Sequence, residues 1–210
     1  MPSPYISSMN PWHVVLVVDD SCAMSGQPSA ILNDTLAVLY GDLLLRARIG
    51  KERIYVSLVS YGSDVQLILE SNDVLECDFS AIPVFRGKRK GRNATAALLE
   101  AERIFLENPG EEVSAQPKVF FLSTGIVDNE EEVRIAASRI KLLSLPSGSP
   151  QIVSLGFGNV KEEILRNVAS DPGQFETLTD VRQICKFVPE SGDMYLSSKP
   201  NFVEEAIMKL

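Results

Sequence analysis

The run from Val14 to Asp19 (VVLVVD) is the feature that most constrains the fold of this chain. Its five consecutive Val and Leu residues lack the polar alternation of a half-exposed strand, which is typical of a strand covered on both faces, as in a parallel sheet. The run ends in two carboxylates, and a loop of small residues then leads to Pro28, where a helix can begin. In α/β folds the loop after such a strand carries the chemistry, so this segment is also the first candidate site.

Further strands and helices alternate along the rest of the chain. The apolar patterns predict strands at 53–61, 64–69, 118–123 and 151–157, and helices at about 28–50, 94–107, 129–145, 160–169 and 181–188. Gly62 and Ser63 separate the strands 53–61 and 64–69, which predicts a hairpin whose second strand lies at a sheet edge. The order predicts an α/β fold, a three-layer α/β/α sandwich around a doubly wound, mostly parallel sheet with one antiparallel edge strand.

Composition excludes several classes of function. The formal net charge of -8 argues against broad affinity for nucleic acid or anionic membrane. Cys22, Cys77 and Cys185 are widely spaced and suggest neither a disulfide framework nor a structural zinc site, which fits a reducing cytoplasm. The run at Val14 has no cationic start, so we expect neither a signal peptide nor a membrane span. His13 is the sole histidine, which disfavours His-based metal sites and a Ser-His-Asp triad.

Several segments, in the right order, resemble the von Willebrand factor A (vWA) family. Asp19-x-Ser21 is similar to the start of the Asp-x-Ser-x-Ser metal motif, and the further matching segments are YVSLVSYGSD (55–64), GRNATAAL (91–98), FFLSTG (120–125), IVSLGFGN (152–159) and LRNVASDPGQF (165–175). The resemblance implies one Rossmann-like vWA domain over residues 1–210, with its core at about 12–190 and a C-terminal extension at 191–210. Within the extension, NFVEEAIMKL (201–210) has apolar residues at helical spacing, and packing against the domain and contact with a neighbouring chain both stay open.

The resemblance also implies a function. The first half of the chain is most similar to the bacterial tellurite-resistance-associated vWA proteins, small cytosolic proteins thought to accompany a kinase-like and a PP2C-like phosphatase partner. We therefore expect a non-enzymatic, cytoplasmic protein-interaction module, an adaptor in a stress or tellurite-resistance system. VFFLSTGIVDNEEEV (119–133) also fits the proteasomal ubiquitin-receptor vWA proteins, and this second interpretation stays open. A third, an α/β hydrolase or nucleotide-binding enzyme, lacks a recognisable nucleophile-base pair or phosphate loop.

The metal motif of the family is incomplete here. Asp19 and Ser21 match family ligands, but the other ligand positions hold Ala23, Arg92 and Thr124. A hard divalent ion takes six or more oxygens, so the loss of these ligands predicts no metal and no cofactor, with residual Mg²⁺ at Asp19 and Ser21 as the alternative. A shift of the alignment would bring Thr95 to the position of Arg92. Without that shift, the Arg92 guanidinium is expected to pair with the Asp19 carboxylate and to repel a cation.

A basic loop contrasts with the acidic composition of the whole chain. It comprises residues 86–92 and carries five cations, which are Arg86, Lys88, Arg89, Lys90 and Arg92. The fold places this loop at the C-terminal edge of the sheet, beside Asp19. The loop is either a solvated, flexible segment or the docking site of an acidic or phosphorylated partner segment, whereas nucleic acid is a less favoured ligand.

Catalytic interpretations of the same region are weaker. Asp19 and Asp20 could act as paired acid and base, but adjacent residues of an extended chain point to opposite faces. Cys22 could be a reactive thiol, although no histidine base is placed near it, and an ordinary small loop residue is favoured. The glycines of 156–158 (GFG) lack the rest of a dinucleotide-binding spacing. We therefore predict no catalytic residue.

Overall fold

The computed structural model describes residues 11–50, 52–110 and 114–186, and in this part of the chain six strands form a single sheet. The strand order is β3-β2-β1-β4-β5-β6. The strands are β1 (Trp12–Asp19), β2 (Ile54–Tyr61), β3 (Val65–Asp73), β4 (Ala115–Ser123), β5 (Gln151–Phe157) and β6 (Phe175–Leu178). All neighbours pair in parallel except β2 and β3, which form the antiparallel hairpin at one edge. The predicted sheet is thereby confirmed.

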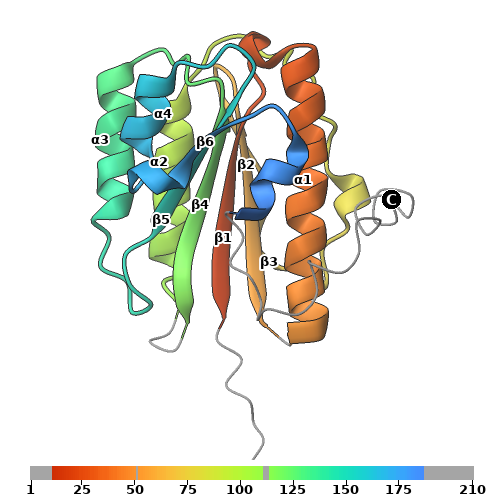
Figure 1. Cartoon of the computed structure of the whole chain (residues 1–210). Helices are drawn as coiled ribbons and strands as arrows, with labels where there is room; N and C mark the ends of the chain where they lie inside the picture. Colours follow the sequence, from red (N-terminus) through yellow and green to blue (C-terminus); the bar gives the residue numbers. More distant parts are fainter. Residues whose placement is uncertain (1–10, 51, 111–113, 187–210) are drawn as a thin grey trace, which may run out of the picture.

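Helices cover both faces of the sheet. They are α1 (Gln27–Leu45), α2 (Ala94–Glu107), α3 (Glu130–Lys141) and α4 (Glu162–Val168). Figure 1 shows α1 on one face and α2, α3 and α4 on the other, which confirms the three-layer sandwich. None of the helices among the described residues is long and apolar enough to cross a membrane.

Two apolar cores explain why the first strand is continuously apolar. Val14, Leu16 and Val18 pack with α1 in one core, and Val15 and Val17 pack with α2, α3 and α4 in the other. Successive side chains of a strand point to opposite faces, so both sets of β1 residues need apolar contacts. Full burial of each of these side chains contributes about 1.5–3 kcal/mol, which fixes β1 at the centre of the sheet.

Local sequence signals set most helix ends. The side chains of Asn93 and Asn129 accept hydrogen bonds from the backbone N–H groups of Ala96 and Glu132, which caps the N-termini of α2 and α3. The helix predicted at 129–145 ends at Lys141, because Leu142 already lies 81% exposed and offers no apolar contact to continue it. The first helix ends at Leu45 and continues as a π-helical turn, Arg46–Gly50.

The last predicted helix, 181–188, is a 3-10 helix, η5 (Val181–Lys186), in its described part. Ile184 of η5 is buried in the same core as α1. The remaining two residues of that prediction and the predicted extension at 191–210 lie outside the described residues. The parallel strands β1, β4 and β5 end at one edge of the sheet, which gathers the loops that follow them.

Candidate functional site

The Asp19 carboxylate at the end of β1 is fully buried and is held by neutral donors. The backbone N–H of Ser21 donates to Oδ1 at 2.9 Å, and the Ser123 hydroxyl at the end of β4 donates to Oδ2 at 3.0 Å. Burial raises the pKa of Asp19, and the hydrogen bonds from Ser21 and Ser123 partly offset that rise. Asp19 thus joins the ends of two neighbouring strands.

A buried tyrosine extends this hydrogen-bonded chain to a third strand. The Tyr61 hydroxyl, at the end of β2, donates to Ser123 Oγ at 2.9 Å, and Ser123 in turn donates to Asp19. Burial, with the nearby Asp19 carboxylate, raises the pKa of Tyr61 well above its ordinary value, so the phenol stays protonated and donates. The chain from Tyr61 through Ser123 to Asp19 satisfies polar groups that the sheet would otherwise leave unpaired.

The donor set around Asp19 is poor for a divalent cation. Both Asp19 oxygens already accept hydrogen bonds, Ala23 carries no oxygen in its side chain, and Thr124 Oγ1 accepts from the Ile126 N–H at 3.2 Å. Ser21 Oγ is the one hydroxyl of the motif that is buried without a hydrogen-bond partner. In the described residues no group of three His, Cys, Asp or Glu side chains is placed so that it could hold a metal ion. One carboxylate and one free hydroxyl do not fit the six or more oxygens that a hard cation takes.

The predicted ion pair between Arg92 and Asp19 is wrong. In the described part of the chain neither side chain makes an ion pair, and Arg92 is held through its backbone instead. Its N–H donates to Asp128 Oδ2 at 2.9 Å, and its carbonyl accepts from the Asp128 N–H at 3.2 Å. Neutral donors from Ser21 and Ser123 already satisfy Asp19, so the buried carboxylate has no free oxygen that requires a guanidinium.

The basic loop is anchored by its backbone to the end of β1. Asp20 Oδ1 accepts the N–H groups of Arg86 at 3.1 Å and Gly87 at 2.8 Å. The Arg89 N–H donates to the Asp20 carbonyl at 3.0 Å, and the Cys22 N–H donates to the Arg89 carbonyl at 2.9 Å. Ser21 and Arg89 thereby form an isolated parallel β-bridge. Asp20 is therefore an anchor of the loop, and not one half of a catalytic pair.

Arg89 differs from the other cations of the basic loop. Its guanidinium donates to Ser60 Oγ at 3.0 Å and to the Asp64 carbonyl at 2.6 Å, and it forms an ion pair with the Asp64 carboxylate at 2.8 Å. The Arg89 side chain is 17% exposed, and its charge lowers the pKa of Asp64 through this contact. Arg89 thus fastens the loop to the β2–β3 hairpin, and its guanidinium is engaged within the fold, unlike the other predicted partner-binding cations.

Two glycines let the loop approach its neighbours closely. Gly87 has φ +60°, and a Cβ there would lie 2.4 Å from the Ser25 backbone nitrogen. Gly91 has φ +67°, and a Cβ there would lie 2.6 Å from Ser63 Cα. Both positions need a left-handed backbone and lack space for a side chain. The glycines therefore hold the loop in close contact with two other loops.

Three cations of the basic loop point into solvent. Arg86, Lys88 and Lys90 are exposed, and no ion pair or side-chain hydrogen bond engages them within the described residues. Arg92 is partly exposed beside them. The sequence grouped the five cations of the basic loop as one partner-binding cluster, with Arg92 also expected to pair with Asp19. The structure divides it into an inward guanidinium and a group of outward charges that a ligand can reach.

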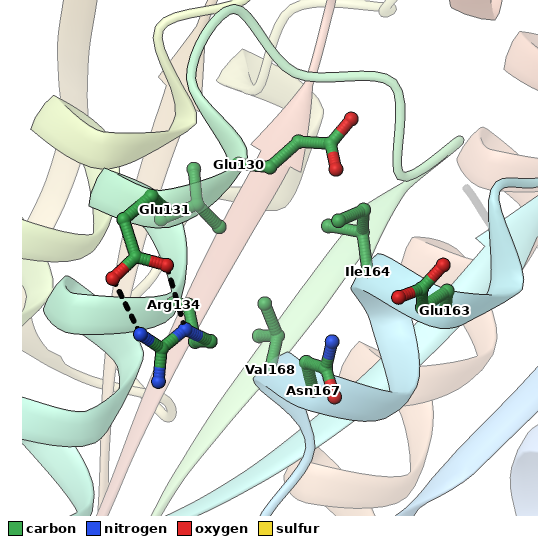
Figure 2. A pocket seen from close by; sticks show the side chains of 8 residues that line it. Glu130, Glu131, Arg134, Glu163, Ile164, Asn167 and Val168 are labelled. Atoms are coloured by element: carbon green, nitrogen blue, oxygen red, sulfur yellow. Dashed lines mark hydrogen bonds and ion pairs between the residues drawn. The ribbon is translucent and has the colours of Figure 1, made fainter.

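A groove opens between α3 and α4, on the helical layer that covers one face of the sheet. It has a volume of about 330 Å³ and is lined by Glu130, Glu131, Val133, Arg134, Glu163, Ile164, Asn167 and Val168. Figure 2 shows Glu131 bonded to Arg134 on α3, with Glu163 and Asn167 on α4. Lys161 pairs with Glu130. Most charges of the groove are thus neutralised within the fold, whereas those of Arg86, Lys88 and Lys90 are not.

Some residues of this edge gave no sequence signal. Ser60, Asp64 and Ser123 are ordinary strand-end residues in the sequence, yet they hold Arg89 and Asp19. The inward orientation of the Arg89 side chain, in contrast, follows from the alternation of side chains along an extended segment. Successive residues of an extended segment point to opposite sides, so Arg89 must face away from Lys88 and Lys90 wherever the loop pairs with β1.

Comparison with known proteins gives the same family by sequence pattern and by fold. The pattern of the von Willebrand factor type A domain family matches residues 13–190. No curated protein sequence matches the chain significantly. Many solved structures share the fold, and the three described next have low sequence identity to this chain. At such identity the similarity shows the fold alone.

The manganese-loaded TRAP protein of Plasmodium vivax is 16% identical, with a TM-score of 0.62 over 85% of this chain and 72% of that chain. The pilus adhesin SpaC of Lactobacillus rhamnosus GG is 13% identical, with a TM-score of 0.65 over 97% of this chain and 31% of the adhesin. A von Willebrand factor type A protein of Catenulispora acidiphila is 14% identical, with a TM-score of 0.60 over 85% of this chain and 41% of that chain. The chain thus spans less than half the length of the last two proteins.

Proposed function

Because the chain belongs to the von Willebrand factor type A domain family, whose members commonly mediate protein-protein contacts, we propose that it is a non-enzymatic interaction module that binds its partner without a metal ion. The docking face is the exposed part of the basic loop, Arg86, Lys88 and Lys90, with Arg92 at its border. The observation that carries the proposal is the division of this loop into an anchored backbone and outward side chains. A fixed backbone holds the three charges in place before a ligand arrives, which lowers the ordering cost of binding.

The partner segment is acidic or phosphorylated. Lys and Arg groups without partners in the fold gain charge-assisted hydrogen bonds from carboxylate or phosphate oxygens. By the resemblance to the tellurite-resistance-associated vWA proteins, the partner is a kinase-like or PP2C-like protein of a bacterial stress response. Exposed charge pairs are screened over about 10 Å at 0.1 M salt, so the complex weakens as salt rises.

The metal-free part of the proposal rests on the Asp19 site. In metal-dependent recognition the cation completes its coordination with an acidic group of the partner. Here the Asp19 carboxylate is fully buried, and both of its oxygens accept hydrogen bonds from the protein. The outward cations of the basic loop offer the partner's acidic group the positive charge that a metal ion would otherwise supply.

The test is affinity capture of the partner from cells that naturally make the protein, with quantitative mass spectrometry, in magnesium and in EDTA. Lys88→Ser/Lys90→Ser removes two outward charges. Arg48→Ser/Arg53→Ser is the control, because it removes the same amount of positive charge. Arg48 and Arg53 are both exposed and lie near the opposite edge of the sheet. We expect the native chain and the control to capture the same protein in both buffers, and the Lys88→Ser/Lys90→Ser variant to lose it. Capture that needs magnesium, or that survives in this variant, overturns the proposal.

A further inference from the structure

Exposed apolar side chains gather on two neighbouring helices, α2 and α3. Within the part of the chain that the structure describes, the large apolar side chains that the α-helices and their caps leave exposed all belong to these two helices, and their exposed fractions lie between 37% and 81%. They are Leu99 and Leu106 of α2, Ile135 of α3 and Leu142 at the C-cap of α3. A single exposed leucine is ordinary, whereas a contiguous group of such residues marks an interaction surface.

An ion pair joins the two helices in the middle of this group. Glu102 of α2 and Arg139 of α3 pair at 2.8 Å, and the two helices cover the same face of the sheet (Figure 1). On a helix, residues three and four positions apart lie on the same face. Glu102 lies three positions after the first exposed leucine of α2 and four before the second, and Arg139 stands in the same way between the two apolar residues of α3. The four side chains therefore form one surface, the α2–α3 patch, which comprises Leu99, Leu106, Ile135 and Leu142.

The described fold does not use the α2–α3 patch. The residues that join α2 to the sheet, such as Leu98 and Phe105, are fully buried on the side of the helix that faces the sheet. In α3 the same role falls to Val133 and Ile140. Helix α4, which covers the same face of the sheet, exposes polar and charged residues such as Glu163. Apolar side chains left in water forgo the free energy that burial would provide, so a partner surface that covers the patch is stabilising.

Charges at the two margins of the patch complement each other. The margin of α2 lies on the side of β3, and it holds two carboxylates and one guanidinium, which belong to Glu100, Glu107 and Arg103. The margin of α3 lies on the side of α4, and it holds two cations and one carboxylate, which belong to Arg134, Lys141 and Glu131. The first margin is therefore acidic and the second basic. Such a patch is complementary to itself, which favours a second copy of this chain over a partner whose docking face has a single charge sign.

The direction of the helices decides how two copies fit together. Helix α2 leads into β4 and α3 leads into β5, and these strands are parallel neighbours, so the two helices run in the same direction. A two-fold rotation about an axis along the helices lays α2 of each copy over α3 of the other, and each acidic margin then meets a basic one. A two-fold rotation about an axis across the helices would instead lay α2 over α2 and bring like charges together.

We propose that the α2–α3 patch is the interface of a dimer of this chain whose two-fold axis runs along the helices. The size of the patch predicts a weak dimer. The 14 residues of α2 span about 21 Å at 1.5 Å per residue, and two helices about 10 Å wide give roughly 400 Å² per copy, at the low end of specific interfaces. The dimer therefore exchanges with the monomer at micromolar concentrations.

The dimer places both basic loops at the same end. Its axis runs along the helices, and in each copy the basic loop directly precedes α2 in the chain. Two basic loops at one end bind a partner that carries two acidic segments more tightly than one loop does. This consequence rests on the docking face proposed above for the basic loop, whereas the dimer itself does not.

Sedimentation equilibrium of the full chain, from about 10 to about 500 µM, tests the dimer over the range of weak affinities. We expect the average mass of the native chain to rise with concentration toward that of two chains. Leu106→Glu/Leu142→Glu places charges in the patch and should weaken the association by at least about tenfold. The control Leu75→Glu/Val84→Glu alters two exposed apolar residues outside α2 and α3 and should associate like the native chain. A native chain that stays monomeric throughout, or a dimer that survives in the patch variant, overturns the proposal.

Exchange of charges between the two margins tests the arrangement of the dimer. Glu100→Lys/Glu107→Lys makes the margin of α2 basic, and Arg134→Glu/Ser138→Glu makes the margin of α3 acidic. Each pair alone sets like charges against each other across the interface and should weaken the dimer by about tenfold. All four substitutions in one chain should restore the native affinity. The two margins face away from each other within one chain, so this restoration arises between copies. Association that stays weak in the fourfold variant, or that neither pair weakens, contradicts the arrangement.

Discussion

The end of β1 and the basic loop that covers it are joined by one β-bridge, yet the two regions handle charge in opposite ways. Asp19 is fully buried and receives neutral hydrogen bonds from Ser21 and Ser123. Lys88 and Lys90, on either side of the bridging residue Arg89, point into solvent with no partner in the described structure. At this edge, therefore, the buried charge of Asp19 holds strands together, whereas the exposed charges of Lys88 and Lys90 are available to a ligand.

Replacement of Asp19 by alanine should cause the largest loss of stability. It leaves the Ser21 N–H and the Ser123 hydroxyl buried without an acceptor, at about 1–3 kcal/mol each, so the free energy of unfolding should fall by about 2–6 kcal/mol. Urea unfolding measures the change. Asp34→Ala removes an exposed carboxylate and should stay within about 0.5 kcal/mol of the native chain. Equal effects of the two substitutions would show that Asp19 is not a structural anchor.

Gly87→Ala tests whether the loop backbone is locked. The new Cβ would lie 2.4 Å from the Ser25 nitrogen at a backbone φ of +60°, and we expect a loss of about 2–4 kcal/mol. Gly148→Ala is the matched control, because Gly148 also has a positive φ but no atom within 4 Å of the added Cβ. It should lose about 1–2 kcal/mol from backbone strain alone. If both variants unfold at the same urea concentration, the close contact of the loop does not exist.

Arg89→Ala and Lys88→Ala separate the inward cation from an outward one. The first substitution removes the donors to Ser60 Oγ and the Asp64 carbonyl, and it should cost about 1–3 kcal/mol in urea unfolding. The second removes a solvated side chain and should change stability by less than about 0.5 kcal/mol. Similar losses in both variants would reject the division of the basic loop into inward and outward charges.

The pH dependence of the Asp19 contribution has a definite sign. Burial raises the pKa of Asp19 in the folded state above the unfolded value of about 3.8, so the folded state binds more protons than the unfolded state between the two pKa values. The stabilisation that Asp19 provides is complete below the unfolded pKa and declines as the pH rises through the folded pKa. The difference in unfolding free energy between the native chain and Asp19→Asn should therefore shrink as the pH is raised from 4. A difference that grows with pH would indicate a lowered pKa instead.

The sequence predicted the bounds of strands and helices best where the apolar residue pattern coincides with the residues that are buried in the fold. Helix α2 and strand β5 have the predicted bounds, because a capping asparagine and a continuous apolar run define them. The prediction for α3 ran on to residue 145, since Leu142 and Leu143 continue the apolar pattern beyond the last turn. Pattern alone cannot show that Leu142 has no surface to pack against.

The site was harder to predict than the fold. The residue types pointed to the end of β1 and to the basic loop as candidate sites, but the partners of each charge depend on contacts between segments far apart in the chain. Arg89 of the basic loop meets Asp64 in the turn between β2 and β3, and Asp19 at the end of β1 meets Ser123 at the end of the neighbouring strand β4. Arg92 was assigned to Asp19 by its position in the family motif and by its charge, whereas neutral donors already satisfy that carboxylate.

The central claim is that no metal ion binds at the end of β1. Its most direct test is the melting temperature of the purified chain in EDTA, Mg²⁺ and Mn²⁺, with Asp19→Ala as the control. An ion at one hundred times its dissociation constant stabilises the folded state by about 2.7 kcal/mol. For a domain of this size that would raise the melting temperature by roughly 5–10 °C. We predict melting temperatures that agree within error in all three solutions. A rise of several degrees in Mn²⁺ that disappears in Asp19→Ala would show that the site at the end of β1 binds a cation.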